Sequence, residues 1–377
     1  MIAGGGVAAL EAMVALGKLA EDRVDTTLLC PETTFANRPL AVAEPFRLGE
    51  VQRFELANLA EGCGARHVRG ALGAVEADAH RIRTTRGIEM GYDALLVACG
   101  AQPRQAVPGA LTFRGPADVP AFRALLDELD AGVVTSLAFA VPGGVTWSLP
   151  LYELALLTSA RLARRDVGGV ELTLVTPEDA PLAIFGGDAS DDVRSLLEAR
   201  DIALQTGSYA DAFREGVLRL VPCATLEVDR VVALPRLVGP RLSGIPQDAD
   251  GFVHVDPHGR VEGLSDVYAA GDITDFPVKQ GGLAAQQADA AAEAIAAAAG
   301  TGVTPRPFDP VLRGLVLTGG PPRYLRSELR RGHGRHSAVG SEPLWWPAGK
   351  VASRYLGPYL AEQAGLAFGG SFAPSLL

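Results

Sequence analysis

The feature that most constrains this chain is a glycine-rich turn at its beginning. Gly4, Gly6 and Ala9 fit the pattern G-x-G-x-x-A, and an apolar helical stretch continues from there to Ala20. Glycines at such a turn let the backbone approach a pyrophosphate, and the N-terminus of the next helix faces that anion. The chain is therefore expected to open with a strand, turn and helix of a parallel α/β sheet.

The residues on either side of this turn depart from the usual pattern. Only three residues precede Gly4, whereas a strand usually has about five or six. A very short first strand and a sequence that begins a few residues late both remain open. The next strand is expected over residues 24–30, where Cys30 occupies the position of an acidic ribose-binding residue and Glu32 follows. Since a glycine-rich turn alone is a weak signal, a purely structural turn is the alternative.

Two further strand-like runs end in small residues. Residues 92–101 end in a turn that contains Gly100, and residues 267–272 end in Gly271 and Asp272. Short apolar runs of this kind are typical of buried strands in a parallel sheet. We expect both to belong to the same nucleotide-binding unit as the first strand.

A second strand, turn and helix lie between these two runs. A strand is expected over residues 135–141, a helix over 151–164 and another strand over 170–175, with a Pro-Gly-Gly turn from Pro142. An alanine-rich helix is expected over 283–299. The order is one βαβ unit, a second βαβ unit and a return to the first, which predicts an α/β fold with two nucleotide-domain-like halves.

The composition narrows the class of protein. With 44 Gly and 26 Pro in 377 residues, the chain suits short strands joined by tight turns better than a helical bundle. A net charge of −10 repels phosphate backbones, so nucleic acid is not an expected partner. The four cysteines form no C-x-x-C pair, which fits a reducing cytosol, and no apolar run reaches the ~18 residues of a spanning helix. His333 and His336 have no third ligand nearby, so no metal site is expected.

Three segments, read in order, resemble a known family. They are GGGVAALE at the beginning, YDALLVACGAQP near residue 100 and VYAAGDITDFPVKQGG near residue 270. Their order and spacing resemble the flavoproteins of the pyridine nucleotide-disulfide oxidoreductase superfamily, which have two dinucleotide-binding domains. The stretches NRPLAVAEPF and FPVKQGG look like the branch that contains sulfide:quinone oxidoreductases and type II NADH dehydrogenases. The resemblance covers about residues 1–300, and the rest of the chain matches mainly in position.

The resemblance implies an α/β fold of two Rossmann-like dinucleotide-binding domains with a C-terminal extension. The FAD-binding domain is discontinuous, because the second nucleotide-binding-like domain is inserted into it. The expected boundaries are 1–112 and 236–300 for the two parts of the FAD-binding domain, 113–235 for the second domain and 301–377 for the C-terminal region.

The resemblance also implies non-covalently bound FAD and a set of residues that hold it. The turn at Gly4 and Gly6 would hold the pyrophosphate, and Asp272 would hydrogen-bond the ribityl chain. A carboxylate at the end of a buried strand independently suits a polyol, although a turn-capping aspartate is the alternative. The residues expected to bind the cofactor are Gly4, Gly6, Ala9, Glu32, Arg38, Gly100, Gly271, Asp272, Lys279 and Gln280.

Three of these residues have a competing interpretation. Matching the Pro-Leu pair after Arg38 to this branch places Cys30, rather than Glu32, at the usual ribose contact, and Arg38 could equally be a surface charge. Lys279 is one of three lysines in a chain that otherwise uses arginine. An ammonium just before a helix would stabilise negative charge on the cofactor or on an incoming quinone, so Lys279 is the expected catalytic residue, with a solvated lysine as the alternative.

Two departures from the family pattern bear on the chemistry. Sulfide oxidation in the related quinone oxidoreductases uses cysteines beside the flavin, but the corresponding positions, 142–147 and 281–283, contain none. A thiol relay is therefore not expected. The second turn, from Pro142, is long and bulky where an NAD(P)H site needs glycines, which argues against a standard site, although Glu178 would suit a ribose.

The C-terminal region presents apolar and aromatic residues at helical spacing. A helix is expected here that Gly357 and Pro358 should kink or break, and one of its faces would contain Val351, Tyr355, Leu356, Tyr359 and Leu360. A bilayer interface, packing on the same protein and packing on a second subunit all remain open for this face.

The sequence thus predicts a cytoplasmic flavoprotein, with peripheral membrane contact and a homodimer left open. It is expected to pass electrons from an unidentified small-molecule donor to a quinone-like or other small acceptor. An NAD(P)H dehydrogenase with an atypical nicotinamide site and a non-catalytic flavin-binding protein are the alternatives.

Overall fold

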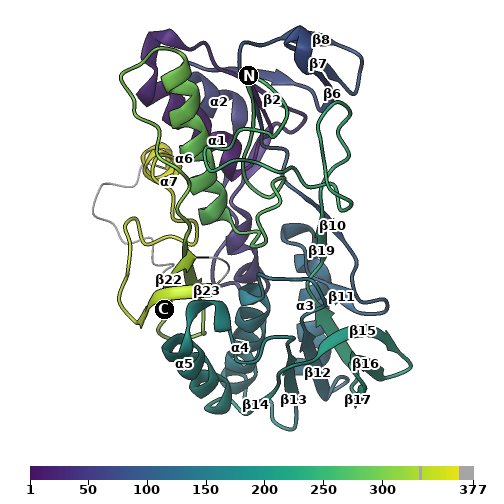
Figure 1. The fold of residues 1–377 in the computed structure, drawn as a ribbon. Coiled ribbons are helices and arrows are strands. Elements are labelled where there is room, and N and C mark those ends of the chain that lie inside the picture. The colour runs from purple at the N-terminus through teal and green to yellow at the C-terminus, as the bar shows by residue number, and fades with distance from the viewer. Residues whose placement is uncertain (331–332, 365–377) are drawn as a thin grey trace.

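The chain folds into two α/β units, and a C-terminal region lies along one side of both (Figure 1). The computed structural model describes residues 1–330 and 333–364. The end of the predicted C-terminal region, residues 365–377, lies outside the described residues, and so does the side chain of His333.

The first unit is built on a five-stranded parallel sheet with the strand order β20-β9-β1-β2-β5. Successive residues point to opposite faces of this sheet, so Ile2 and Leu28 contact the helices while Ala3 and Leu29 contact the opposite layer. The strands of the sheet are β1 (Ile2–Ala3), β2 (Thr27–Cys30), β5 (Arg66–Arg69), β9 (Leu95–Val97) and β20 (Val267–Ala269).

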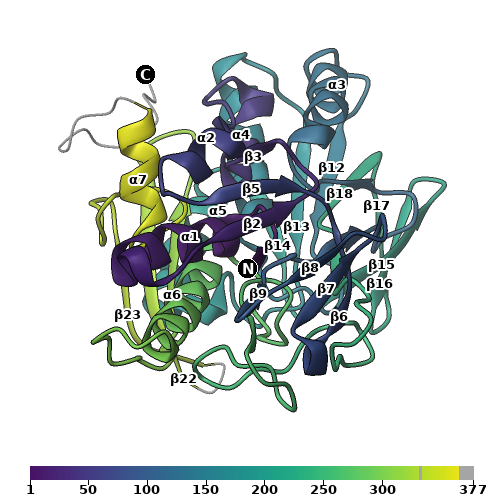
Figure 2. The ribbon, with the colours of Figure 1, turned by 90° about the horizontal axis from the view of Figure 1, so that it is seen from above.

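Two helices cover one face of this sheet. Helices α1 (Val7–Leu19) and α6 (Gly281–Ala298) pack against each other, and seen from above they lie side by side with α7 (Leu356–Gln363) next to α1 (Figure 2). Both α1 and α6 are rich in alanine, which allows close helix–helix contact. The opposite face is covered by an antiparallel layer made of β6 (Leu72–Glu76), β7 (Arg81–Thr84) and β8 (Glu89–Gly91).

The second unit repeats the same plan with the strand order β11-β18-β12-β13-β14, again all parallel. An antiparallel layer covers one face and helices cover the other. The strands of its sheet are β11 (Leu111–Thr112), β12 (Ser136–Ala140), β13 (Glu171–Val175), β14 (Ile202–Gln205) and β18 (Arg230–Ala233). Its helices are α3 (Val119–Asp130), α4 (Leu149–Arg164) and α5 (Gly187–Glu198), and its antiparallel layer is β15 (Tyr209–Arg214), β16 (Val217–Val221) and β17 (Ala224–Glu227).

The chain crosses between the units twice, and the two crossings pair with each other. Strand β10 (Gln102–Arg104) leaves the first unit, β19 (Arg236–Val238) returns to it, and the two are hydrogen-bonded in an antiparallel pair. The first unit is therefore discontinuous in sequence. The predicted domain boundaries themselves stay predictions.

The C-terminal region adds an antiparallel sheet and a short helix. The sheet consists of β21 (Val311–Val316), β22 (Arg323–Arg330) and β23 (His333–Gly340), and α7 follows it. The remaining short elements are β3 (Thr34–Ala36), β4 (Arg53–Glu55), α2 (Leu56–Glu61), η1 (Glu21–Arg23), η2 (Arg38–Val42), η3 (Glu44–Phe46), η4 (Ala77–Ala79), η5 (Pro116–Asp118) and η6 (Ala183–Phe185).

The predicted α/β fold with two Rossmann-like units is confirmed, whereas the predicted C-terminal helix is wrong in its extent. Helix α7 begins at Leu356, so Gly357 and Pro358 lie in its first turn, where a missing N–H is tolerated and no kink results. Its apolar face packs on the same chain, because Tyr355, Leu356 and Leu360 belong to the core beneath α1.

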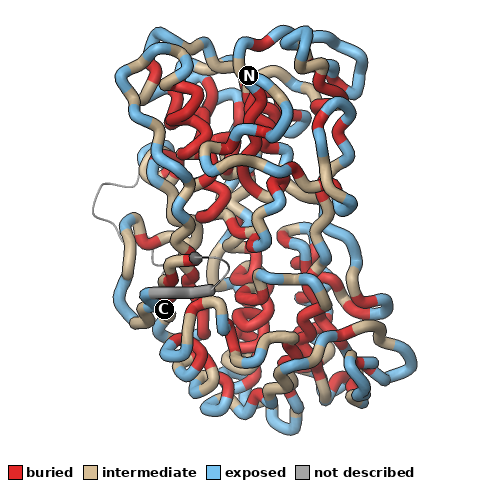
Figure 3. The backbone as a smooth tube through the Cα atoms, in the orientation of Figure 1, coloured by how far each residue is buried: buried red, intermediate tan, exposed pale blue. Residues whose placement is uncertain are grey.

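Buried residues fill the centres of both units (Figure 3). No helix among the described residues is long and apolar enough to cross a membrane.

Candidate functional site

The glycine turn after β1 combines a backbone that needs glycine with an open surface. Gly4 has φ +143°, and a Cβ added there would lie 2.1 Å from the carbonyl oxygen of Ala98. A Cβ added at Gly6, which precedes α1, would meet no atom within 4 Å. Ala9, the third residue of the pattern, is fully buried against the sheet. The free N–H groups at the start of α1 thus face open space, as a pyrophosphate site requires.

The ends of β2 and β9 bring Glu32 and Gly100 near this turn. The thiol of Cys30 donates a hydrogen bond to Oε2 of Glu32 at 3.2 Å, and a Cβ on Gly5 would lie 2.5 Å from the same sulfur. Burial and the neighbouring Glu32 carboxylate raise the pKa of Cys30 to about 12, so this residue stays a thiol. Gly100 follows β9 with φ +68°, a conformation that favours glycine. The exposed carboxylate of Glu32, rather than Cys30, is therefore the group near the turn that could accept hydrogen bonds from a ribose.

Asp272 lies at the end of β20 beside the same turn. Gly271, with φ +82°, lets β20 approach α1 closely, since an added Cβ would lie 2.9 Å from Cβ of Ala8. Its N–H donates to Oε1 of Gln287 at 2.7 Å, which fixes the turn. Burial raises the pKa of Asp272, while the charges of Lys279 and Arg38 oppose that rise.

The Asp272 carboxylate has no hydrogen-bond partner within the described part of the chain, although it is half-buried and lines a large cavity. A partly buried carboxylate without protein donors takes its hydrogen bonds from water or from a ligand, so Asp272 is free to accept hydrogen bonds from a bound group. This position, and the open glycine turn beside it, fit the ribityl and pyrophosphate groups of FAD.

The side chains of Lys279 and Gln280 have different contacts. The Lys279 ammonium donates to the carbonyl oxygen of Thr274 and lies 3.9 Å from the centre of the Phe252 ring. Burial lowers the pKa of Lys279 to about 8, with the opposing charges of Asp272 and other carboxylates limiting the shift. The side chain of Gln280 accepts from the N–H of Leu283 at 2.9 Å and so caps α6, which gives it a structural task.

A cavity of about 490 Å³ is lined by some of the predicted residues and by side chains from the second unit and the C-terminal region. This size falls within the range of small-molecule and cofactor sites. Residues 38–42, 272–281, 144–153 and 313–315 all contribute to its walls, so both units and the C-terminal region enclose it. Among the predicted residues, the cavity brings together Arg38, Asp272, Lys279 and Gln280.

A buried ion pair in the wall of this cavity was not predicted. Glu153 on α4 and Lys350 in the C-terminal region are in contact, and their side chains are only 1% and 7% exposed. Oε1 of Glu153 also accepts from the N–H of Leu317 at 2.8 Å, whereas Oε2 is buried without a partner among the described residues. Burial raises the pKa of Glu153 and lowers the pKa of Lys350, and their mutual attraction opposes both shifts.

Two signals in the sequence pointed toward this pair. Lys350 is one of three lysines, and Glu153 interrupts an apolar helical run. Their separation of 197 residues made the contact itself unpredictable. Arg313 is a further residue of the cavity wall that the sequence did not reveal, and burial lowers its pKa.

The turn of the second unit closes over the cavity. The Thr146 hydroxyl donates to the carbonyl oxygen of Pro277 at 2.5 Å, which joins this turn to the first unit. The Glu178 carboxylate, which could have served a ribose, already accepts from the hydroxyls of Ser148, Tyr152 and Thr176 at 3.1, 2.8 and 2.8 Å. The Glu178 carboxylate is thus engaged in hydrogen bonds within the second unit, and the expected lack of a standard NAD(P)H site stays a prediction. None of the four cysteines lines the cavity, as far as its walls are described.

Comparison with known proteins defines the family. The family model of the pyridine nucleotide-disulphide oxidoreductases matches residues 1–298, and the chain belongs to this family. Its members are flavin-dependent oxidoreductases that bind FAD. The predicted family and cofactor are therefore confirmed.

Two NADH dehydrogenase-like proteins, from two strains of Mycobacterium tuberculosis, are 28% identical to this chain over 236 residues. That match covers 59% of this chain and 58% of each relative, which is less than two thirds of their length.

Solved structures show the same fold at lower sequence identity. The sulfide:quinone oxidoreductase of the hyperthermophilic bacterium Aquifex aeolicus is 18% identical, with a TM-score of 0.80, over 90% of this chain and 86% of that one. NDH2 of Plasmodium falciparum, solved in complex with NADH, is 17% identical with a TM-score of 0.59, over 72% of this chain and 63% of that one.

Proposed function

We propose that this protein is an FAD-dependent oxidoreductase that passes electrons from a small-molecule donor to a quinone-like acceptor without a cysteine relay. The observation that carries the proposal is the Glu153–Lys350 pair, which is buried in the wall of the cavity that also contains Asp272 and Lys279. A quinone takes up two protons together with two electrons. Its site therefore needs buried groups that can hold and release protons beside a flavin.

Bound FAD would supply the electron transfer, and the chain's own residues would position the ligands and handle protons. Asp272 would accept hydrogen bonds from the hydroxyls of the cofactor. Lys279 places a positive charge in the same wall, where it would stabilise developing negative charge in a site with little water.

The buried pair can supply a proton to the acceptor. Lys350 holds the proton at Nζ, and burial makes that proton easier to release because it disfavours the charged ammonium. Glu153 keeps the lysine oriented through Oε1, while its unpartnered Oε2 is available to a proton. A proton lost to the acceptor would be replaced from solvent before the next cycle.

The electron donor is the open part of this proposal. The NADH dehydrogenase-like relatives favour NADH, whereas the occupied Glu178 carboxylate and the closed turn at Thr146 argue against a standard nicotinamide site. Anaerobic titration of the FAD-loaded protein with NADH, NADPH and sulfide separates these cases. We expect slow or no bleaching of the flavin by any of the three, and rapid bleaching by NADH would make the protein an NADH dehydrogenase with an atypical site.

The transfer of electrons from the reduced flavin to the acceptor is tested without knowing the donor. The FAD-loaded protein is reduced with one equivalent of dithionite and mixed with a soluble ubiquinone analogue, and flavin absorbance is followed by stopped flow. Replacing the whole pair in Glu153→Gln/Lys350→Met avoids an unpaired buried charge, and we expect reoxidation to slow by about tenfold or more.

The matched control for this experiment is Lys18→Met, which removes an exposed lysine on α1. Equal reoxidation rates in the pair variant, the control and the wild type would contradict the proposed role of the pair. No reoxidation of the wild type by quinone would contradict the proposed acceptor. A cytoplasmic location, a peripheral membrane contact and a homodimer stay predictions.

A further inference from the structure

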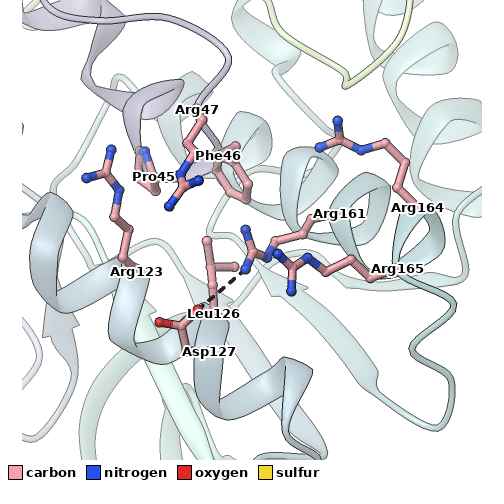
Figure 4. Close-up of a pocket in the computed structure, with 9 residues that line it drawn as sticks. All are labelled: Pro45, Phe46, Arg47, Arg123, Leu126, Asp127, Arg161, Arg164 and Arg165. Atoms are coloured by element: carbon pink, nitrogen blue, oxygen red, sulfur yellow. Dashed lines mark hydrogen bonds and ion pairs between the residues drawn. The ribbon is translucent and has the colours of Figure 1, made fainter.

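A second cavity, of about 350 Å³, is lined mainly by arginine (Figure 4). It lies where the segment after η2 meets helices α3 and α4. Its lining residues are Pro45, Phe46, Arg47, Arg123, Leu126, Asp127, Arg161, Arg164 and Arg165. Five guanidinium groups therefore surround one hollow in a chain whose net charge is −10.

The arginines reach this hollow from three different elements. Arg47 follows η3, Arg123 lies on α3, and the other three belong to the C-terminal end of α4. Figure 4 shows the guanidinium groups of Arg47, Arg161 and Arg165 around the same space, with Arg123 and Arg164 on its two flanks. Basic residues in the last turn of α4 are expected beside the negative end of the helix dipole. That effect does not account for Arg47 and Arg123, which come from elsewhere.

Acidic side chains neutralise only part of this charge. Asp130 contacts Arg161 at 2.5 Å and Arg165 at 2.9 Å, and Asp127 lies 3.5 Å from Arg161. Nearby, the Glu44 carboxylate accepts from the N–H of Val51 and thus serves the backbone.

The other three arginines of the pocket, Arg47, Arg123 and Arg164, form no ion pair with a carboxylate of the described residues. Arg123 donates to the carbonyl oxygen of Glu44 at 2.6 Å, and Arg164 donates to that of Ala160 at 3.4 Å. Neither Arg47 nor Arg164 contacts a carboxylate within the described residues. With Asp127, Asp130 and Glu44 against five arginines, the hollow keeps a positive charge of about two, a repulsion that an anion would relieve.

We propose that this pocket binds a small soluble anion that carries more than one phosphate group. The planar, five-donor guanidinium matches phosphate oxygens in pairs, and several arginines at one site favour a multiply charged ligand. The hollow is small, and Pro45, Phe46 and Leu126 supply the apolar part of its lining, so a compact ligand fits it better than an extended protein or membrane surface.

Such a ligand would join the two units directly. Arg47 belongs to the first unit and the other four arginines to the second, so one anion could contact both. The same helix, α4, carries Glu153 in the flavin cavity and Arg161 here, about 12 Å further along at 1.5 Å per residue. The arginine pocket and the larger cavity therefore share no lining residue, although both have walls formed by α4.

The test is isothermal titration calorimetry of the FAD-loaded protein with inorganic pyrophosphate, with sodium chloride at matched ionic strength as the blank. Flavin absorbance is recorded throughout, so that displacement of FAD from its own pyrophosphate site is detected. The variant Arg47→Gln/Arg164→Gln removes two exposed arginines that have no carboxylate partner among the described residues. The matched control, Arg86→Gln/Arg214→Gln, removes the same charge from exposed positions outside the pocket.

We expect saturable pyrophosphate binding to the wild type and the control, weakened about tenfold or more in Arg47→Gln/Arg164→Gln. Equal affinity in all three proteins, or heat no greater than that of the chloride blank, would overturn the proposal. A flotation assay with phosphatidylglycerol vesicles is run in parallel, and capture by vesicles without binding of pyrophosphate would also overturn it. Because the readout needs no turnover, these results are independent of the donor and the acceptor.

Discussion

At the scale of single residues, the two glycines of the N-terminal turn have different tasks. Gly4 is required by the protein itself, because its φ of +143° and the nearby Ala98 carbonyl exclude a side chain. Gly6 has an ordinary extended backbone and open space where a Cβ would be. The fold itself does not require the free space at Gly6, and we propose that the pyrophosphate of the cofactor occupies it.

This difference predicts opposite effects of two alanine substitutions. Without cofactor, Gly4→Ala should lower the free energy of unfolding by about 2–4 kcal/mol, whereas Gly6→Ala should change it by no more than about 1 kcal/mol. Gly6→Ala should nevertheless weaken FAD binding, because its methyl group would occupy space next to the pyrophosphate. Urea unfolding of the apoprotein and flavin fluorescence titration measure the two effects. A Gly6→Ala variant that binds FAD as tightly as the wild type would place the pyrophosphate elsewhere.

Sequence motifs predict the neighbourhood of some residues of the 490 Å³ cavity, whereas other wall residues depend on the tertiary fold alone. Asp272 and Lys279 follow a recognisable strand, so their neighbourhood could be predicted. The Glu153–Lys350 contact depends on how the C-terminal region folds back over α4, and no local pattern encodes that path. Gln280 also lies in the cavity wall, and its side chain caps α6, a structural task that the motif did not reveal; its role in binding the cofactor stays a prediction.

At the scale of secondary-structure elements, the strands and helices of the two units could be predicted because they have strong apolar patterns and glycine-rich ends. Strand β12 and helix α4 were expected over 135–141 and 151–164 and extend over Ser136–Ala140 and Leu149–Arg164. The C-terminal helix was misjudged because its attachment is tertiary. Glu11, fully buried on α1, accepts from the N–H groups of Arg354, Tyr355 and Leu356 and so fixes the beginning of α7.

The attachment of α7 should make stability depend on pH. Asp289 on α6 lies beside Glu11, and burial together with the Glu11 charge raises the pKa of Asp289 to about 8. The folded protein therefore keeps a proton that the unfolded chain loses near pH 4. Stability from this group is complete below about pH 4 and is lost as the pH rises toward 8, at no more than about 1.4 kcal/mol per pH unit.

Asp289→Asn should remove this decline, since an amide cannot lose the proton. We expect the variant to lose less stability than the wild type between pH 5 and pH 8 in urea unfolding experiments. The control is Asp25→Asn, which changes an exposed aspartate and should follow the wild type. Parallel pH profiles for all three proteins would show that Asp289 is ionised in the folded state.

At the scale of the whole molecule, one of the hydrophobic clusters spans the two units and the C-terminal region. A single cluster of buried side chains contains Phe46 from the first unit, Phe122 and Leu154 from the second, and Leu325 and Ala348 from the C-terminal region. The 490 Å³ cavity is enclosed by the same three parts of the chain. The units therefore resemble Rossmann domains individually but are not packed as independent bodies.

This shared core predicts that the protein unfolds in one step and that FAD stabilises all of it. Calorimetry of the apoprotein should show a single transition, because separating the units would expose the common cluster to water. Adding FAD at 100 times its dissociation constant should raise the free energy of unfolding by about 2.7 kcal/mol and move that transition as a whole. Limited proteolysis at the same FAD concentration should protect cleavage sites in both units equally. Two transitions, of which FAD shifts only one, would instead mean that the cofactor is held by the first unit alone and that the cavity walls from α4 and the C-terminal region do not contribute to its binding.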